Sequence, residues 1–285
     1  MLTPDVTRKG GGMSGRFEGA VAAVTGGSSG IGQACARLLA SQGATVYVMA
    51  RSRERLATTV ASIHREGGNA RAIEVDVTSG EQLARAAAAL QQVEGRLDIL
   101  IAGAGIMDLG PAADLPPEQF EAMMRVNYFG VVETVRRFLP LLRLGRHKRI
   151  AIIASLAAKI APPYFGAYSA SKAAVAGFAH ALRQELRPEG MRVSLVHPGP
   201  TATPLVDGYI GGEYYPVPPG VPIVAPELVA RATLKAIARG RREVFVPRRL
   251  AVTAWLAAIA PGAVDLTYRL LGDKSRQEPH GKVER

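Results

Sequence analysis

The stretch Ala20-Val21-Ala22-Ala23-Val24, followed by Thr25-Gly26-Gly27-Ser28-Ser29-Gly30-Ile31-Gly32, decides the fold of this chain. The first part is a short apolar run without alternation, which is typical of a buried parallel strand. Residues 33–42 then have helical spacing, with Cys35, Leu38 and Leu39 on the inward face. Glycines between a strand and a helix let the backbone approach a pyrophosphate, and the helix N-terminus offers free N–H groups. The stretch therefore predicts a dinucleotide-binding loop; an ordinary flexible strand-to-helix loop is the alternative.

Further apolar runs alternate with helical segments along the rest of the chain. They span residues 45–49, 70–74, 99–101, 150–154, 192–196 and 243–246. Such alternation indicates right-handed crossovers and a parallel sheet covered on both faces. We therefore expect a single-domain α/β fold: a Rossmann-like, doubly wound sheet of about seven parallel strands with helices on both faces.

Tyr168 and Lys172 are four residues apart in a predicted helix, so one lies above the other. A phenol with a pKa of about 10 is a poor acid or base near neutral pH, and a fixed cation beside it lowers that pKa. Ser155 stands thirteen residues before Tyr168, at the end of the run 150–154, and can reach the same carbonyl oxygen. The three side chains predict general acid/base chemistry on a carbonyl. Taken alone, the Tyr/Lys spacing also fits a solvated helix face.

Together these motifs resemble the short-chain dehydrogenase/reductase family over residues 19–246. The glycine stretch is similar to that family's Thr-Gly-x-x-x-Gly-x-Gly, and Tyr168 and Lys172 match its Tyr-x-x-x-Lys. Asn127 matches a helix-kinking asparagine, Asp76-Val77 an adenine contact, and the segment 198–203 a Pro-Gly stretch beside the nicotinamide. The resemblance implies the catalytic residues Asn127, Ser155, Tyr168 and Lys172. It implies cofactor contacts from Gly26, Ser28, Ser29, Gly30, Ile31, Gly32, Arg51, Ser52, Asp76, Val77, Ala102, Gly103, Ala104, Tyr168, Lys172, Pro198, Gly199, Thr201 and Thr203.

One motif departs from the family pattern. Where relatives usually have Asn-Asn-Ala-Gly, this chain has Ala102-Gly103-Ala104-Gly105. The small residues keep room for a ribose, but the missing amides remove hydrogen bonds to the neighbouring strand. We expect a cost in stability and not in chemistry.

The end of the second strand indicates which nicotinamide coenzyme binds. An acidic residue there would bind the ribose 2′-hydroxyl and repel a 2′-phosphate. This chain has Arg51 and Ser52 instead, with no acid until Glu54. A guanidinium fork suits a phosphate, so we expect NADP(H). A solvated arginine beside an NAD pocket is the alternative.

The resemblance and the residues together predict an NADPH-dependent oxidoreductase that transfers a hydride between the nicotinamide and a ketone or secondary alcohol. The alternative is a non-catalytic dinucleotide-sensing protein on the same fold. Relatives commonly form homodimers or homotetramers, here through the segments 116–144 and 169–186.

The composition limits which kinds of ligand and binding partner are expected. The net charge is +11, which fits an anionic ligand, a membrane surface or a generally basic exterior; no nucleic-acid motif accompanies it, and we expect no nucleic-acid partner. Cys35 is the only cysteine and the histidines lack ligand spacing, so we expect no metal site. His197, at a strand end, is expected to be a structural or surface histidine. Residues 1–18 are expected to be a disordered leader without a signal segment. We expect the protein in the cytoplasm, either free or associated with a membrane.

Two regions are expected to set the substrate. Residues 204–224, within the catalytic domain 19–247, are rich in glycine and proline and carry Tyr209, Tyr214 and Tyr215, which suggests a loop over a partly apolar pocket. Residues 248–272 form an apolar helical extension, followed by a polar tail, 273–285. In it Val252, Trp255, Leu256 and Ile259 share one helix face. That stripe is expected to pack on protein, to lie on a membrane surface between basic flanks, or to belong to a lid on the active site.

Overall fold

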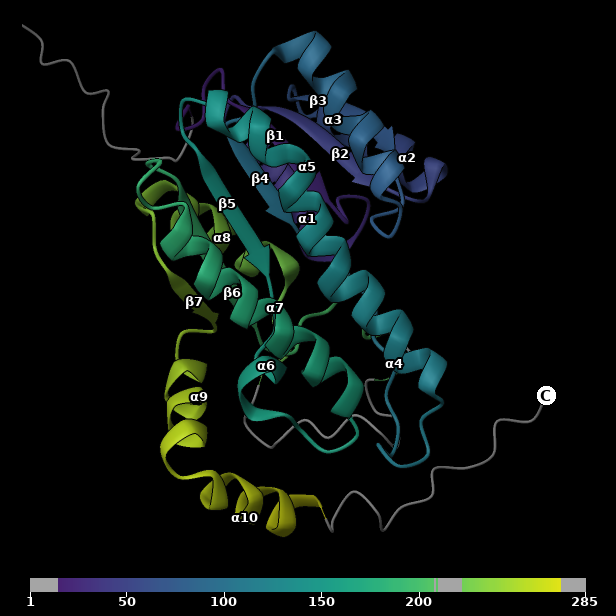
Figure 1. Cartoon of the computed structure of the whole chain (residues 1–285), viewed down its shortest axis with the longest axis vertical. Helices are drawn as coiled ribbons and strands as arrows, with labels where there is room; N and C mark the ends of the chain where they lie inside the picture. The colour runs from purple at the N-terminus through teal and green to yellow at the C-terminus, as the bar shows by residue number, and fades with distance from the viewer. Residues whose placement is uncertain (1–14, 208, 210–221, 273–285) are drawn as a thin grey trace, which may run out of the picture.

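A computed structural model describes residues 15–207, 209 and 222–272 of the chain, without the side chains of the last two. Its centre is one sheet of seven strands in the order β3-β2-β1-β4-β5-β6-β7 (Figure 1). The strands are β1 (Val21–Thr25), β2 (Thr45–Ala50), β3 (Asn69–Glu74), β4 (Ile99–Ala102), β5 (Arg149–Ile153), β6 (Arg192–Pro198) and β7 (Glu243–Val246). All neighbouring pairs are parallel. The predicted doubly wound fold is confirmed, with strand ends within two residues of those expected from the apolar runs.

Helices cover both faces of the sheet, and each face has its own hydrophobic core. On one face pack α3 (Gly80–Glu94), α5 (Gly130–Leu144) and α7 (Gly166–Glu185). On the other pack α1 (Gly30–Ala40), α2 (Arg53–Arg65) and α8 (Pro226–Arg239). The central strands are buried on both sides, which explains why they read as unbroken apolar runs rather than alternating ones.

The order of the strands reverses between β1 and β4. From β1 the chain builds outward through β2 and β3, then returns to β4 and builds the other way. Parallel sheets bind ligands outside the carboxyl ends of their strands at such a reversal. The glycine loop follows β1 and the segment 102–105 follows β4, so both border this crevice.

The long helix expected over residues 116–144 is continuous but not uniform. It comprises α4 (Pro117–Met123), a π-helical turn η1 (Met124–Phe129) and α5. Asn127 lies inside η1 and is fully buried. A π-helical turn inserts one residue into the helical ladder and is frequent at functional sites. The kink that the family resemblance implied at Asn127 therefore has a physical form in this chain.

Two helices follow the last strand, α9 (Leu250–Ile259) and α10 (Pro261–Gly272), and together they form an elbow beside α6 (Ala157–Ile160) (Figure 1). Within the described chain α9 contacts protein through Leu250 and Ala254, which are buried against Leu156, Ile160 and Phe245. The predicted stripe does share one face, but that face is exposed: Trp255 is 64% and Leu256 43% accessible. The expectation that this stripe packs on the chain's own core is therefore wrong. Apart from Thr253, α9 is apolar all round, so periodicity could not tell which face would be buried.

Among the described residues no single helix is long and apolar enough to cross a membrane. Only α9 and α10 taken together are long and apolar enough, and the chain bends by 115° between these two helices.

The structure describes only parts of the N-terminal segment and of the loop 204–224. Residues 15–19 form turns in which Phe17 is buried, and the domain boundary expected at residue 19 stays a prediction. Most of the loop 204–224, with Tyr214 and Tyr215, and the tail 273–285 lie outside the described residues. Tyr209 is described, and its hydroxyl donates to Met107 O or Asp108 Oδ1, each at 3.1 Å.

Candidate active site

The glycine loop after β1 is packed so closely that side chains would not fit. Gly26 has a φ of +68°, and a Cβ on it would stand 2.8 Å from the backbone of Ala104. A Cβ on Gly32 would collide with the carbonyl of Gly26. Gly30, with φ of +52°, lies against Thr203. The loop thus presents bare backbone at the start of α1, where unpaired N–H groups favour an anion, and it fits the diphosphate of a dinucleotide.

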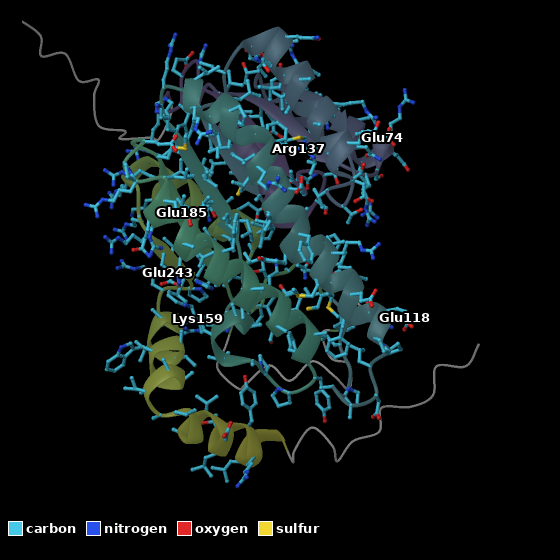
Figure 2. All side chains as sticks on the ribbon, in the orientation of Figure 1. Glu74, Glu118, Arg137, Lys159, Glu185 and Glu243 are labelled. Carbon is cyan, nitrogen blue, oxygen red and sulfur yellow. The ribbon has the colours of Figure 1, made fainter. Side chains whose placement is uncertain are left out.

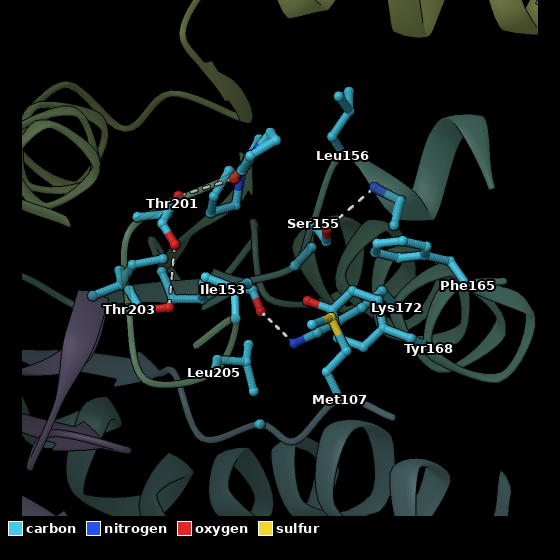
Figure 3. Close-up of a pocket in the computed structure, with 18 of the residues that line it drawn as sticks. Met107, Ile153, Ser155, Leu156, Phe165, Tyr168, Lys172, Thr201, Thr203 and Leu205 are labelled. Atoms are coloured by element: carbon cyan, nitrogen blue, oxygen red, sulfur yellow. Dashed lines mark hydrogen bonds between the residues drawn. The ribbon is translucent and has the colours of Figure 1, made fainter. Parts of the chain in front are cut away.

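Tyr168 and Lys172 lie one turn apart on α7, and both are buried, at 6% and 4% exposure. The Lys172 Nζ atom is 5.8 Å from the centroid of the Tyr168 ring and donates to the backbone oxygen of Ile153 at 3.1 Å (Figure 3). Burial lowers the pKa of Lys172 from 10.5 to about 8. The pair is therefore set inside the protein rather than on a solvated helix face, so the alternative left open by the spacing does not hold.

Ser155 enters the same space from the end of β5. Its Oγ accepts a hydrogen bond from the N–H of Ala157 at 3.1 Å, which leaves its own O–H free to donate to another group. Figure 3 shows Ser155 and the Tyr168–Lys172 pair together on one side of a pocket, with Thr201 and Thr203 on the other. Three elements far apart in sequence thus meet at one point.

Asn127 lies behind this group and not in the pocket wall. Its Nδ2 donates to Ile106 O and to Ser171 Oγ, both at 2.9 Å, and its Oδ1 accepts from Ile106 N at 2.8 Å. Gly105 separates it from the lysine: a Cβ there would lie 3.2 Å from Asn127 Oδ1 and 3.4 Å from Lys172 Nζ. The backbone of Gly105 therefore lies between the Asn127 amide, behind the pocket, and the Lys172 ammonium group in its wall.

The pocket has a volume of about 420 Å³. Of the predicted residues it brings together Gly26, Ser29, Gly30, Ile31, Gly32, Gly103, Ser155, Tyr168, Lys172, Pro198, Gly199, Thr201 and Thr203. It does not include Ser28, Ala102, Ala104 or Asn127, nor the four residues predicted for the adenosine end. Large apolar side chains dominate the rest of the wall, among them Met107, Leu156, Phe165 and Leu205.

The residues predicted for the adenosine end gather at the β2–β3 side of the sheet. Arg51 is exposed, and its Nη1 lies 4.0 Å from Asp76 Oδ2. Ser52 is the N-cap of α2 and accepts from the N–H of Arg55 at 3.3 Å. Val77, next to Asp76, is buried beneath Gly130. This cluster is separate from the pocket that holds Tyr168, as expected for two ends of an extended ligand.

Comparison with known proteins identifies the family of this chain. The family model described as short chain dehydrogenase matches residues 20–210. This chain belongs to the short-chain dehydrogenase/reductase family. It is 34% identical to the ketoacyl reductase HetN of Nostoc sp. over 255 residues, which is 87% of this chain and 88% of that protein.

Solved structures of other family members have the same fold. A short chain dehydrogenase from Burkholderia cenocepacia in complex with NADP is 33% identical, with a TM-score of 0.74 over 90% of this chain and 98% of that one. A short chain dehydrogenase/reductase from Burkholderia phymatum in complex with NAD is 25% identical, with a TM-score of 0.77 over 95% of this chain and 99% of that one. The family thus binds either nicotinamide coenzyme.

The departure from the family pattern after β4 is compensated in part by backbone contacts. The N–H of Gly103 lies 3.2 Å from both the carbonyl and the hydroxyl oxygen of Thr25, at the end of β1. Ala104 packs directly against Gly26. The two strand ends therefore remain joined without the asparagine side chains of the family pattern, and the expected stability cost stays a prediction.

His197 supports the position of Ser155, from outside the pocket. Its ring is fully buried and stacked on Phe245. The Nδ1 atom is 2.8 Å from the backbone oxygen of Ser155, and Nε2 is 2.7 Å from Glu243 Oε1. The hydrogen bond from His197, followed by that from Lys159, holds the pKa of Glu243 at about 2. Lys159 and Glu243 lie side by side in Figure 2, 3.1 Å apart. The expectation of a structural histidine is confirmed.

Sequence reasoning missed part of the pocket wall. Leu250 and Thr253 of α9 and Val264, Thr267 and Tyr268 of α10 line it. The extension is thus part of the site, as the lid interpretation allowed. No signal in the sequence distinguishes these residues from their outward-facing neighbours. Within the described ranges, no cluster of three or more His, Cys, Asp or Glu side chains could hold a metal ion.

Proposed function

We propose that this protein is an NADPH-dependent oxidoreductase, acting in the cytoplasm or at a membrane surface, that interconverts a partly apolar ketone and its secondary alcohol. The observation that carries the proposal is the meeting of Ser155, Tyr168 and Lys172 in one pocket with the bare-backbone glycine loop. Short-chain dehydrogenases act on CH–OH and C=O groups with NAD(P), so the family supplies the reaction class.

When bound at this site, a nicotinamide would supply the hydride for the carbonyl carbon, or take it up in the reverse direction. The Tyr168 hydroxyl gives its proton to the carbonyl oxygen, and the Ser155 O–H donates a hydrogen bond to the same atom. Charge developing on that oxygen is thereby stabilised by two donors fixed in advance. The Lys172 ammonium group stabilises the tyrosinate left behind, which keeps the proton transfer favourable near neutral pH.

Asn127 is proposed to act indirectly. Its amide is held by Ile106 and Ser171, and it lies beyond Gly105 from Lys172. This placement supports a role in positioning a water molecule that links Lys172 to solvent and returns the proton used by Tyr168. It also fixes η1 against α7, which keeps the lysine in register.

The coenzyme preference is proposed from Arg51 and Ser52. A guanidinium at the end of β2 and a hydroxyl and N–H at the first turn of α2 suit a 2′-phosphate. Asp76 is close to Arg51, but 4.0 Å between exposed groups is a weak ion pair that a phosphate can displace. Asp76 and Val77 are then left to contact the adenine, as the family resemblance implied.

The substrate is proposed to carry an apolar chain or ring beyond its carbonyl. Apolar side chains surround the reacting group, and both C-terminal helices add to the wall. A relative that reduces ketoacyl groups is consistent with this class. We also propose a homodimer or homotetramer through α4–α5 and α7, whose outer residues include the exposed Phe129 and Leu144.

The proposal is tested by following NADPH and NADH oxidation with ketones of increasing chain length. We expect turnover with NADPH in preference to NADH, rising with apolar chain length. Tight NADPH binding without turnover on any of the ketones would favour the alternative, a dinucleotide-sensing protein.

A further inference from the structure

The outer face of the α9–α10 elbow carries a concentration of exposed apolar side chains. Six large hydrophobic residues on these two helices are exposed: Val252, Trp255, Leu256, Ile259, Leu266 and Leu270. Exposed large hydrophobics elsewhere on the described surface are fewer and lie on separate elements, such as Val93 on α3 and Leu228 on α8. An apolar concentration of this kind marks a surface that is covered in use.

The charges around this face are basic. Arg248 and Arg249 stand at the start of α9, and Arg269 lies between Leu266 and Leu270 on α10; all three are exposed. Asp265 is the single acidic residue between residues 248 and 270. Arginines flanking an apolar helical face, with a tryptophan on that face, are the composition of helices that lie in an anionic membrane interface.

The opposite side of the same elbow lines the active-site pocket. Thr253, Val264 and Tyr268 face the cavity, while Leu256 and Ile259 point away from the protein. One pair of helices therefore has an outer apolar face with basic flanks and an inner face next to the reacting groups. A lipid surface at the outer face would lie one helix thickness away from the pocket.

We propose that the α9–α10 elbow docks on an anionic phospholipid surface and lets the enzyme take an apolar ketone from that surface. The second part rests on the proposed function; the docking does not. A second copy of this chain fits the face less well, because it would bring the same arginines with it. An anionic headgroup layer provides the opposite charge, worth about 1 kcal/mol for each basic side chain near it.

Trp255 gives a direct readout, because it is the only tryptophan in the chain and lies on the proposed face. Its emission is recorded while vesicles of phosphatidylcholine and phosphatidylglycerol in equal parts are added, and again with pure phosphatidylcholine. We expect a blue shift and co-sedimentation with the anionic vesicles, weakened by added salt, and little of either with the neutral ones.

Substitutions with matched controls locate the surface. Leu256→Glu should lower partitioning onto the anionic vesicles about tenfold or more, since a buried leucine is worth about 1.5–3 kcal/mol. Arg248→Glu should lower it about fivefold or more. The controls Leu228→Glu, at a leucine 39% exposed on α8, and Arg231→Glu, on the same helix, should leave it unchanged. Circular dichroism and NADPH binding show whether each variant is folded.

The outcomes separate the two proposals. Equal binding to neutral and anionic vesicles, no binding, or equal losses in the controls overturns the docking. So does a blue-shifted emission without lipid that Leu256→Glu abolishes while halving the molecular mass, since a second copy then covers the face. Turnover of a short, water-soluble ketone is measured in parallel: docking without turnover contradicts only the proposed function, and turnover without docking contradicts only the lipid surface.

Discussion

On two helices of this molecule, α7 and α9, the sequence spacing places a group of side chains on one face. The group on α7 is buried, and the group on α9 is exposed. On α7, Tyr168 and Lys172 are polar and buried. On α9, Val252, Trp255, Leu256 and Ile259 are apolar and exposed. Periodicity predicts which residues share a face in both helices. Topology decides what that face contacts. The helix α7 connects β5 to β6 and must lie on the sheet. The helix α9 follows the last strand, and within the described residues it is buried through Leu250 and Ala254 in its first turns.

The first variant removes the reacting hydroxyl from α7 without disturbing the packing of the helix. Tyr168→Phe keeps the ring and deletes the hydroxyl, so turnover should fall by about 10²–10⁴-fold or more while NADPH binding stays nearly unchanged. Steady-state NADPH oxidation and fluorescence titration of the coenzyme measure the two effects. Turnover within a few-fold of the wild type would remove Tyr168 from the mechanism.

The second variant measures how much the buried ammonium group of Lys172 lowers the stability of the folded protein. Lys172→Met should abolish turnover yet stabilise the coenzyme-free protein. The pKa of Lys172 is about 8 instead of 10.5, and at about 1.4 kcal/mol per pKa unit its buried charge costs roughly 3 kcal/mol near pH 7.

The stability of the folded wild-type protein should rise with pH because of Lys172. Between pH 8 and 10.5 the unfolded chain holds the Lys172 proton and the folded chain has lost it, so the folded state gains stability as the pH rises. Below pH 8 the full cost remains. The stability difference between Lys172→Met and the wild type, from urea unfolding, should therefore be largest below pH 8 and shrink toward pH 10.5. A stability difference that does not vary between pH 8 and 10.5 would show that burial does not lower the pKa of Lys172.

The third pair of variants compares the two faces of α9. Leu250→Ala removes a side chain buried against Leu156, Ile160 and Phe245, and should weaken the docking of the helix by about 2–5 kcal/mol. Leu256→Ala, on the exposed face, should change it by less than about 0.5 kcal/mol. Hydrogen exchange of the amides in α9 reports both. Similar protection losses in the two variants would mean that the face assignment is wrong.

The smallest expected effect concerns the coenzyme. Arg51→Ala removes one charge-assisted contact to phosphate, worth roughly 1.5–3 kcal/mol, so affinity for NADPH should fall about tenfold or more while affinity for NADH changes little. Dissociation constants for both coenzymes are measured on the wild type and the variant. Equal losses, or a wild type that prefers NADH, would show that the β2 end is not the selecting element.

Much of the fold and of the inner site could be predicted from sequence because local rules and topology agree there. The apolar runs gave seven parallel strands, and the glycine loop fell between β1 and α1. Ser155 follows the carboxyl end of β5, and α7, which carries Tyr168 and Lys172 in its first turns, begins shortly after it, so the three side chains were expected at one edge of the sheet. His197 was expected to be structural, and its bonds to Ser155 and Glu243 agree.

The rest could not be predicted because it depends on contacts between distant segments. The role of Gly105 between Asn127 and Lys172 needs the π-helical turn, which has no sequence period of its own. The burial of Leu250 and not Leu256 depends on how the chain leaves β7. On α9 the single polar residue Thr253 defines no polar face that would orient the helix, so its place in the pocket wall went unrecognised, as did that of Tyr268 on α10.

The most direct test of the central claim is to follow the hydride itself. The enzyme is incubated with NADPH deuterated at C4 of the nicotinamide, using each stereoisomer in turn, and with an apolar ketone, and the product is analysed by mass spectrometry. The predicted result is a secondary alcohol with one deuterium on the carbinol carbon from one stereoisomer only, formed at least about 10²-fold more slowly by the Tyr168→Phe variant. Unlabelled alcohol from both stereoisomers, or no alcohol while NADPH binds tightly, would contradict hydride transfer by this chain.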